Sequence, residues 1–115
     1  MIERLRQICL ALPDVEESVI HGHPVFRVPK GRTGKSFCIW HGVEGDPAIA
    51  LKVAKSEQGI FLADSRFYKT PYIGQHGWVS IRAKGRLDWE EIAELVKGSY
   101  QLAAPRKRKS RIALS

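Results

Sequence analysis

Hydrophobic residues recur with a helical period near both ends of the chain. Leu5, Ile8, Cys9 and Leu12 are spaced three and four residues apart, which predicts an amphipathic helix over residues 2–12 that ends before Pro13. Near the other end, Asp88-Trp89-Glu90-Glu91 has the D-x-x-E spacing of a helix capping box. An apolar stripe from Ile92 to Ala103 follows it, so we predict a second helix that Asp88 caps and Pro105 ends.

Between these helices the pattern changes to alternation, which is typical of strands. Residues 48–53 and 78–84 alternate most clearly, and residues 19–28 and 35–40 also look extended, with a turn at Gly22-His23-Pro24. Ser56 is expected to cap a short helix through Ala63, and residues 64–76 are expected to be irregular. Because the loops are short, we predict an α+β fold: a small antiparallel sheet packed against N- and C-terminal helices.

Length and composition fit one globular domain. The chain has 115 residues, of which 43% are hydrophobic, and we assign the domain to residues 1–104 and a basic flexible tail to residues 105–115. No apolar run approaches the roughly 20 residues that span a bilayer, and the first residues lack a signal-peptide pattern. Cys9 and Cys38 form no CxxC pair, so we expect reduced thiols in a cytoplasmic protein without a membrane partner.

The net charge of +7 is unevenly distributed. Residues 27–86 contain eleven Lys and Arg against four Asp and Glu, and residues 105–115 contain five Lys and Arg with no acidic residue. Such asymmetry indicates an anionic partner for the middle segment or the tail. The alternative is that the charge serves solubility alone.

Strand alternation predicts that the cations share one face of the sheet. If Phe26, Phe37, Ile39 and their aliphatic counterparts face the helices, then the neighbouring residues face away. That second face would hold Arg27, Cys38, Trp40, Lys52, Trp78, Arg82 and Lys84.

Lysine and arginine on this face would neutralise phosphates, and tryptophan would stack on an unpaired base. The leading prediction is therefore a non-enzymatic nucleic-acid-binding domain, with DNA as the partner. The alternatives are a small-molecule or protein-interaction site on the same face, or ordinary solvent-side residues. With the basic loop that precedes residue 36, the predicted nucleic-acid-binding residues are Arg27, Lys30, Arg32, Lys35, Lys52, Trp78, Arg82 and Lys84.

Motifs for catalysis, metals or cofactors are missing from the sequence. Gly34-Lys35-Ser36 resembles the end of a phosphate-binding loop, but Pro29 stands where that loop needs glycine, and a strand is predicted to follow. His21 and His23 would share a face within a strand, and His41 and His76 are further candidates, yet neither HExxH nor a ligand set at recognisable spacing appears. No GxSxG is present. On the predicted cationic face, Lys52 or Arg27 could lower the pKa of Cys38, but we expect this thiol to be unreactive. We predict no catalytic residue, metal or cofactor.

A series of short segments resembles the MmcQ/YjbR family. They are Leu12-Pro13-Asp14-Val15-Glu16-Glu17, His21-Gly22-His23-Pro24-Val25-Phe26-Arg27-Val28, Phe37, Leu51-Lys52, Gly77-Trp78-Val79 and Ser99-Tyr100. Their order and spacing cover residues 1–104, and the tail is not part of the pattern. The resemblance implies a small α+β domain of the double-wing kind that is described as DNA-binding. It places the family's recurrent positions at Pro24, Phe26, Lys52, Gly77 and Trp78, and it carries no catalytic residue.

Overall fold

A six-stranded antiparallel sheet forms the centre of the molecule. The computed structural model describes residues 2–29, 33–43 and 45–104, in which every paired strand runs antiparallel to its neighbour, in the order β1-β2-β3-β4-β6-β5. The predicted α+β class with an antiparallel sheet is therefore confirmed. The strands are β1 (Glu16–Ile20), β2 (His23–Arg27), β3 (Ser36–Val43), β4 (Asp46–Lys52), β5 (Phe67–Lys69) and β6 (Trp78–Arg82).

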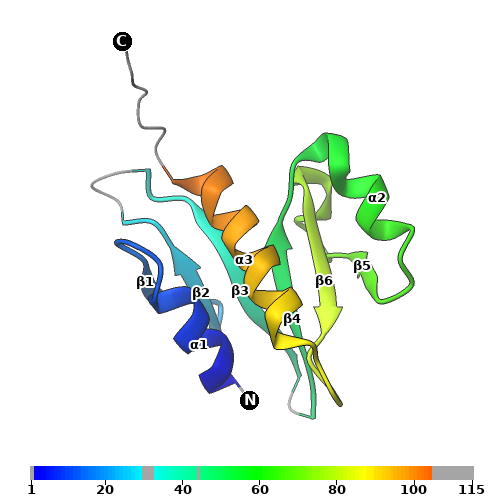
Figure 1. Ribbon diagram of the computed structural model, residues 1–115, viewed down its shortest axis with the longest axis horizontal. Helices are drawn as coiled ribbons and strands as arrows, with labels where there is room; N and C mark the ends of the chain where they lie inside the picture. The colour runs from blue at the N-terminus through cyan, green and yellow to red at the C-terminus, as the bar shows by residue number, and fades with distance from the viewer. Residues whose placement is uncertain (1, 30–32, 44, 105–115) are drawn as a thin grey trace.

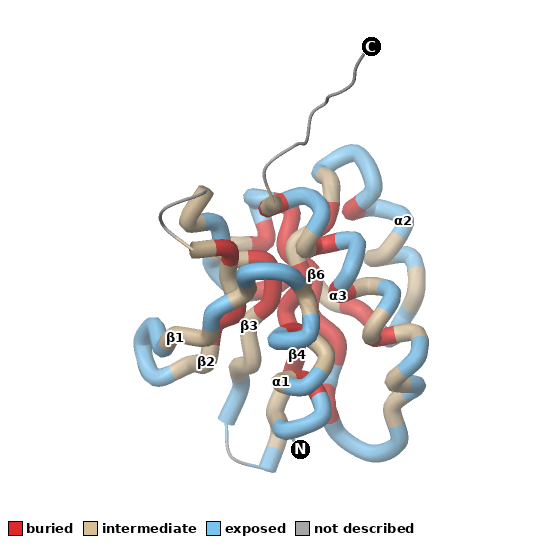
Figure 2. Tube along the Cα trace, turned by 60° about the vertical axis from the view of Figure 1, so that its left-hand side comes forward, coloured by how far each residue is buried: buried red, intermediate tan, exposed pale blue. Residues whose placement is uncertain are grey.

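The helices cover one face of this sheet. Helix α1 (Ile2–Leu10) and helix α3 (Trp89–Ala103) lie side by side across it, while η1 (Lys55–Glu57) and α2 (Gln58–Leu62) lie beside β5 and β6 (Figure 1). Leu5 from α1 and Val96 from α3 are fully buried against Leu51 and Val79 from the sheet. Each such aliphatic side chain contributes about 1.5–3 kcal/mol by leaving water. Figure 2 shows the buried residues concentrated along the central strands.

Local signals explain where several elements begin and end. Asp88 accepts hydrogen bonds through Oδ1 from the backbone N–H groups of Glu90 (3.1 Å) and Glu91 (3.2 Å), as its capping position predicts. The Glu91 carboxylate pairs instead with Arg66, so only half of the capping box forms. The predicted cap at Ser56 is wrong, because neither η1 nor α2 has a side-chain cap.

A two-residue turn separates β1 from β2. His21 (φ 54°) and Gly22 (φ 79°) both have positive φ, which is the signature of the type I′ turns that favour hairpins. The expected extended segment over residues 19–28 is therefore a hairpin, and β5 lies in the region that was expected to be irregular. A further 3₁₀ turn, η2 (Gly74–His76), follows β5 and leads into β6.

The predicted orientation of β3 is wrong after Phe37. Phe26 pairs with Cys38 but Arg27 pairs with Ser36, so β3 carries one extra residue, a β-bulge. A bulge of one residue reverses the face of every side chain beyond it. Phe37 and Cys38 consequently both lie in the core on the helix side, and Ile39 turns to the opposite face.

Candidate functional site

The face of the sheet opposite the helices is the predicted binding surface, and we call it the outer face. By register, Val25, Ile39, Ala50 and Ser80 form one row across four neighbouring strands on this face. Lys52 and Trp78 form the next row, and Arg82 lies on the same face opposite Ala48. Trp40 pairs with Ile49 and packs against the core, so it lies on the helix side. The two tryptophans therefore lie on opposite faces and form no joint surface.

The outer-face Trp78 is also poorly suited to stacking. It is only 7% exposed, so its ring has little surface to offer an unpaired base. Hydrogen bonds fix the adjoining segment: Gln58 donates through Nε2 to the carbonyls of Gly74 (2.6 Å) and Trp78 (3.2 Å), and Val53 donates to the carbonyl of Gly77 (2.7 Å). Trp78 therefore packs within the fold and does not form an exposed aromatic platform.

Two of the predicted cations on this face have acidic partners. Arg27 lies 3.0 Å from Glu16 in the neighbouring strand. Arg82 lies 3.3 Å from Asp46, and its guanidinium stacks 5.2 Å from the ring of Tyr68. Exposed ion pairs of this kind contribute roughly 0–1 kcal/mol each, so a phosphate could compete for them at low cost.

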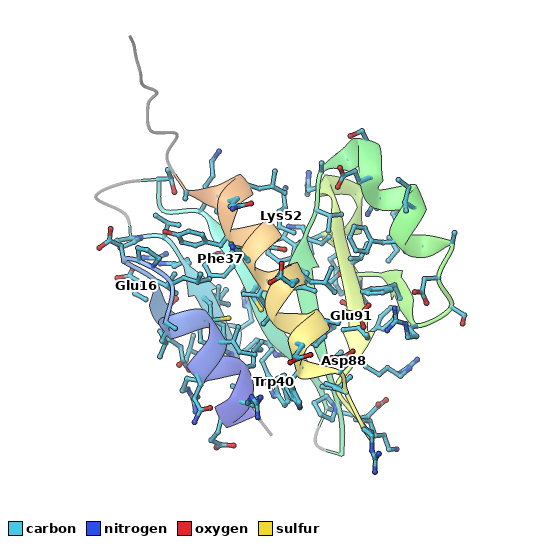
Figure 3. All side chains as sticks on the ribbon, in the orientation of Figure 1. Glu16, Phe37, Trp40, Lys52, Asp88 and Glu91 are labelled. Carbon is cyan, nitrogen blue, oxygen red and sulfur yellow. The ribbon has the colours of Figure 1, made fainter. Side chains whose placement is uncertain are left out.

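The predicted basic residues separate into two groups. Lys52 lies opposite Trp78, and Arg82 comes four residues later in β6, which places the two rows about 13 Å apart along the strand. Lys84 follows Arg82 and borders a cavity of about 690 Å³ together with Trp40, Ile2 and Pro24. Figure 3 shows Lys52 and Phe37 near the C-terminal end of α3, with Trp40 toward the other end of the sheet.

The group around Lys52 lies where the loop before β3 and the end of β4 both contact helix α3. Thr33 donates through Oγ1 to the carbonyl of Ala103 (2.8 Å), which joins the loop before β3 to the last turn of α3. Ser99 donates to the carbonyl of Lys52 (2.6 Å), which joins the end of β4 to the same helix. We call this the basic end. Its cations are Lys35, Lys52 and Lys55, which have no acidic partner among the described residues, and Arg27, which lies opposite Ser36 and is paired with Glu16.

Lys55 is absent from the predicted site, although it lies three residues after Lys52. Its Nζ donates to the carbonyl of Gln75 (2.8 Å), while Lys52 donates to the carbonyl of His76. A backbone carbonyl leaves the ammonium charge uncompensated. The predicted residues Lys30 and Arg32, and the tail at 105–115, lie outside the described residues.

The histidines and cysteines do not assemble into a metal site in the described part of the chain, where no three ligating side chains gather. His21 occupies a turn position and His23 begins β2, so they are not the same-strand pair that their spacing suggested. Cys38 is fully buried beside Cys9, and burial raises its pKa well above the ordinary value. Its placement on the cationic face is therefore wrong, and its thiol is not activated. Ser36 begins a strand, which excludes a phosphate-binding loop there.

Comparisons with known proteins give one family match and two similar solved structures. A family model described as YjbR matches residues 10–102. The fold is similar to that of the Deinococcus radiodurans protein DR2400, which has a DUF419 domain: the TM-score is 0.75 at 20% identity, over 89% of this chain and 77% of that one. A Pseudomonas syringae protein gives a TM-score of 0.67 at 22% identity, over 87% of this chain and 97% of the other. No curated protein matches the chain. Among the described helices, none has both the length and the apolar character to cross a membrane.

Proposed function

We propose that the chain, which belongs to the YjbR family, is a non-enzymatic nucleic-acid-binding domain. The family match supplies the fold and names no ligand, so the proposal is argued from this chain's own charges. The proposed partner is DNA, as the family resemblance implies. The proposed site is the basic end, not the whole outer face. The YjbR match and the shared fold do not distinguish this function from others, so the proposal depends on the placement of charge.

One observation supports the proposal above all: the hydrogen bond from Thr33 to the carbonyl of Ala103. Residues 27–35 contain four cations and no acidic residue, and residues 105–115 contain five cations and no acidic residue. This hydrogen bond holds Thr33, in the first segment, against Ala103, which comes two residues before the second segment begins. Thr33 and Ala103, 70 residues apart in the sequence, thus lie together near the end of α3, where Ser99 also contacts Lys52.

This arrangement suits contacts to phosphate. Lysine ammonium groups bind phosphate as point charges, and each contact releases counterions from the nucleic acid. At the basic end, Trp78 is buried and offers no exposed ring to an unpaired base. Contacts to phosphate position a protein without reading bases, so we expect weak sequence preference and strong salt dependence.

The test is fluorescence anisotropy with a labelled duplex, in the full chain, at several salt concentrations. Lys35→Glu with Lys52→Glu should weaken binding at least tenfold at low salt. The slope of log K against log salt should fall by about 0.9 for each phosphate that the variant no longer neutralises. Lys35 lies in an exposed loop, so Lys35→Glu alone provides a variant that folds if the double variant does not.

A matched control distinguishes the loss of a specific binding site from the loss of positive net charge. Arg86→Glu with Lys97→Glu makes the same charge change at exposed positions of the loop after β6 and of α3. This control should weaken binding by no more than about twofold. Equal weakening in both double variants would show a response to net charge alone, and unchanged binding in Lys35→Glu/Lys52→Glu would exclude the basic end.

We also propose a cytoplasmic location. Cys9 and Cys38 are buried neighbours that remain free thiols, which suits a reducing compartment. Cell fractionation with a compartment marker tests this, and recovery in a secreted or envelope fraction would contradict it.

A further inference from the structure

A cleft of about 610 Å³ opens on the outer face, between the β1–β2 hairpin and the segment that follows β5. Its volume falls within the roughly 300–1,000 Å³ that small-molecule sites occupy. Val25, Ile39 and Ala50 lie beneath it on three neighbouring strands, and Val25 and Ala50 are themselves fully buried.

Large apolar side chains stand exposed around the cleft. Tyr72 is 95% exposed, and it has a positive φ of 70°, a backbone conformation that costs free energy for a residue other than glycine. Val43 is 71% exposed and Ile20 is 43% exposed. Exposed apolar groups gathered at one hollow are typical of a surface that a ligand covers.

A chain of hydrogen bonds supplies one polar point in this apolar setting. The Nε2 atom of His41 lies 2.9 Å from Oγ of Ser80, which lies 2.8 Å from Oγ1 of Thr70. Either hydroxyl can be the donor in the second bond, so the chain can run in both directions. Within residues 2–29, 33–43 and 45–104, Nδ1 of His41 has no hydrogen-bond partner. If Nε2 carries the proton and donates to Ser80, Nδ1 can accept a hydrogen bond from a ligand. If Ser80 donates to Nε2, Nδ1 carries the proton and can donate to a ligand.

The lining also restricts the charge of the ligand. Among the residues that the structure describes, the lining includes no Lys, Arg, Asp or Glu, and it includes three histidines. Burial, followed by the nearby His23, lowers the pKa of His41, which keeps its imidazole neutral at pH 7. An ionic ligand would lose its hydration here without gaining a countercharge. We propose that this cleft binds a neutral, largely apolar small molecule that forms one hydrogen bond with His41.

The position of the cleft argues against a peptide added as a strand. Its floor comes from β2, β3 and β4, whose backbone groups already pair with strands on both sides. Strand addition needs a free edge, which β1 and β5 supply instead. The inference is also independent of nucleic-acid binding, because a neutral ligand gives a salt-independent affinity.

The first test uses Nile red, a neutral apolar dye, titrated into the full chain while its emission is recorded. Saturable binding of one dye per chain is expected, with little change between low and high salt. Ala50→Leu adds bulk at a fully buried position directly beneath the cleft and should weaken binding at least tenfold. Because overpacking can also disturb the fold, Tyr72→Ser provides a second variant at the exposed rim, where at least threefold weaker binding is expected.

Ile60→Ser is the matched control, since Ile60 is a large apolar residue on α2, 73% exposed, that does not line the cleft. It should leave dye binding unchanged. Equal effects of Tyr72→Ser and Ile60→Ser, or unchanged binding in Ala50→Leu, would overturn the proposal. Concentration-dependent dimerisation that Tyr72→Ser abolishes would overturn it too, because a second copy would then be the occupant.

The hydrogen bond is tested with indole, which can donate it, and benzofuran, which can accept it, each compared with indene, which has a similar shape and does neither. Ligand-observed NMR should show a preference of about fivefold over indene for one of the two, as one net hydrogen bond allows, and no preference for either would contradict the hydrogen bond. His41→Leu should abolish the preference while indene still binds. A preference that survives His41→Leu would show that His41 is not the polar contact.

Discussion

Removing the hydroxyl of Ser80 should destabilise the protein far more than removing that of an exposed serine. Ser80 is fully buried and its Oγ joins His41 to Thr70 at 2.9 and 2.8 Å. In Ser80→Ala, Oγ1 of Thr70 stays buried without its partner. An unsatisfied buried group costs about 1–3 kcal/mol, and each kcal/mol lowers the melting temperature of a domain near this size by about 4–8 °C.

A double-mutant cycle separates this cost from general disturbance. Thr70→Val removes the second hydroxyl, and Ser80→Ala with Thr70→Val removes both members of that bond. The double variant should be destabilised by about 1–2 kcal/mol less than the sum of the single variants, because no orphaned hydroxyl remains between them. Urea unfolding followed by tryptophan fluorescence measures all three changes. Additivity within about 0.3 kcal/mol would refute the coupling, and a destabilisation below about 0.5 kcal/mol in Ser80→Ala would refute the burial cost.

Three further predictions concern the half-buried His41, the fully buried Phe37 and the two buried cysteines. Lowering the pH from about 7 to 5 should destabilise the fold. The pKa of His41 is lowered in the native state, so the unfolded chain binds a proton that the native one does not. His41→Gln should reduce this effect in thermal melts. Phe37→Ala should cost about 3–5 kcal/mol, since Phe37 is fully buried against Tyr100, while Ile39→Ala beyond the bulge should cost clearly less; equal costs would contradict the bulge. Cys9 and Cys38 should react with a thiol reagent only as fast as the chain unfolds, and rapid labelling in native buffer would contradict their burial.

Strong local signals made much of the fold predictable. The alternation around Ile49 and Val79 located β4 and β6, and the capping position of Asp88 located the start of α3. By contrast, β5 has three residues, which is too short for alternation to show. The bulge next to Phe37 left no trace in residue type, because it contains no glycine and both Phe37 and Cys38 suit a core.

The site was less predictable because it depends on contacts between distant segments. Parity correctly grouped Arg27, Lys52, Trp78 and Arg82 on one face. Alternation does not predict the distance along the strands, and this distance separates Lys52 from Arg82. The contact between Thr33 and Ala103 spans 70 residues, and no local pattern encodes it. The outer cleft likewise depends on how the hairpin turn and the segment after β5 close over the sheet.

Mapping amide shifts on titration with a short DNA duplex, at two salt concentrations, tests the central claim most directly. The proposed basic end predicts salt-sensitive shifts at Thr33, Lys35, Lys52 and Lys55, with little change around Arg82 and Lys84. Shifts concentrated around Arg82 and Lys84, or no shifts at low salt, would contradict it.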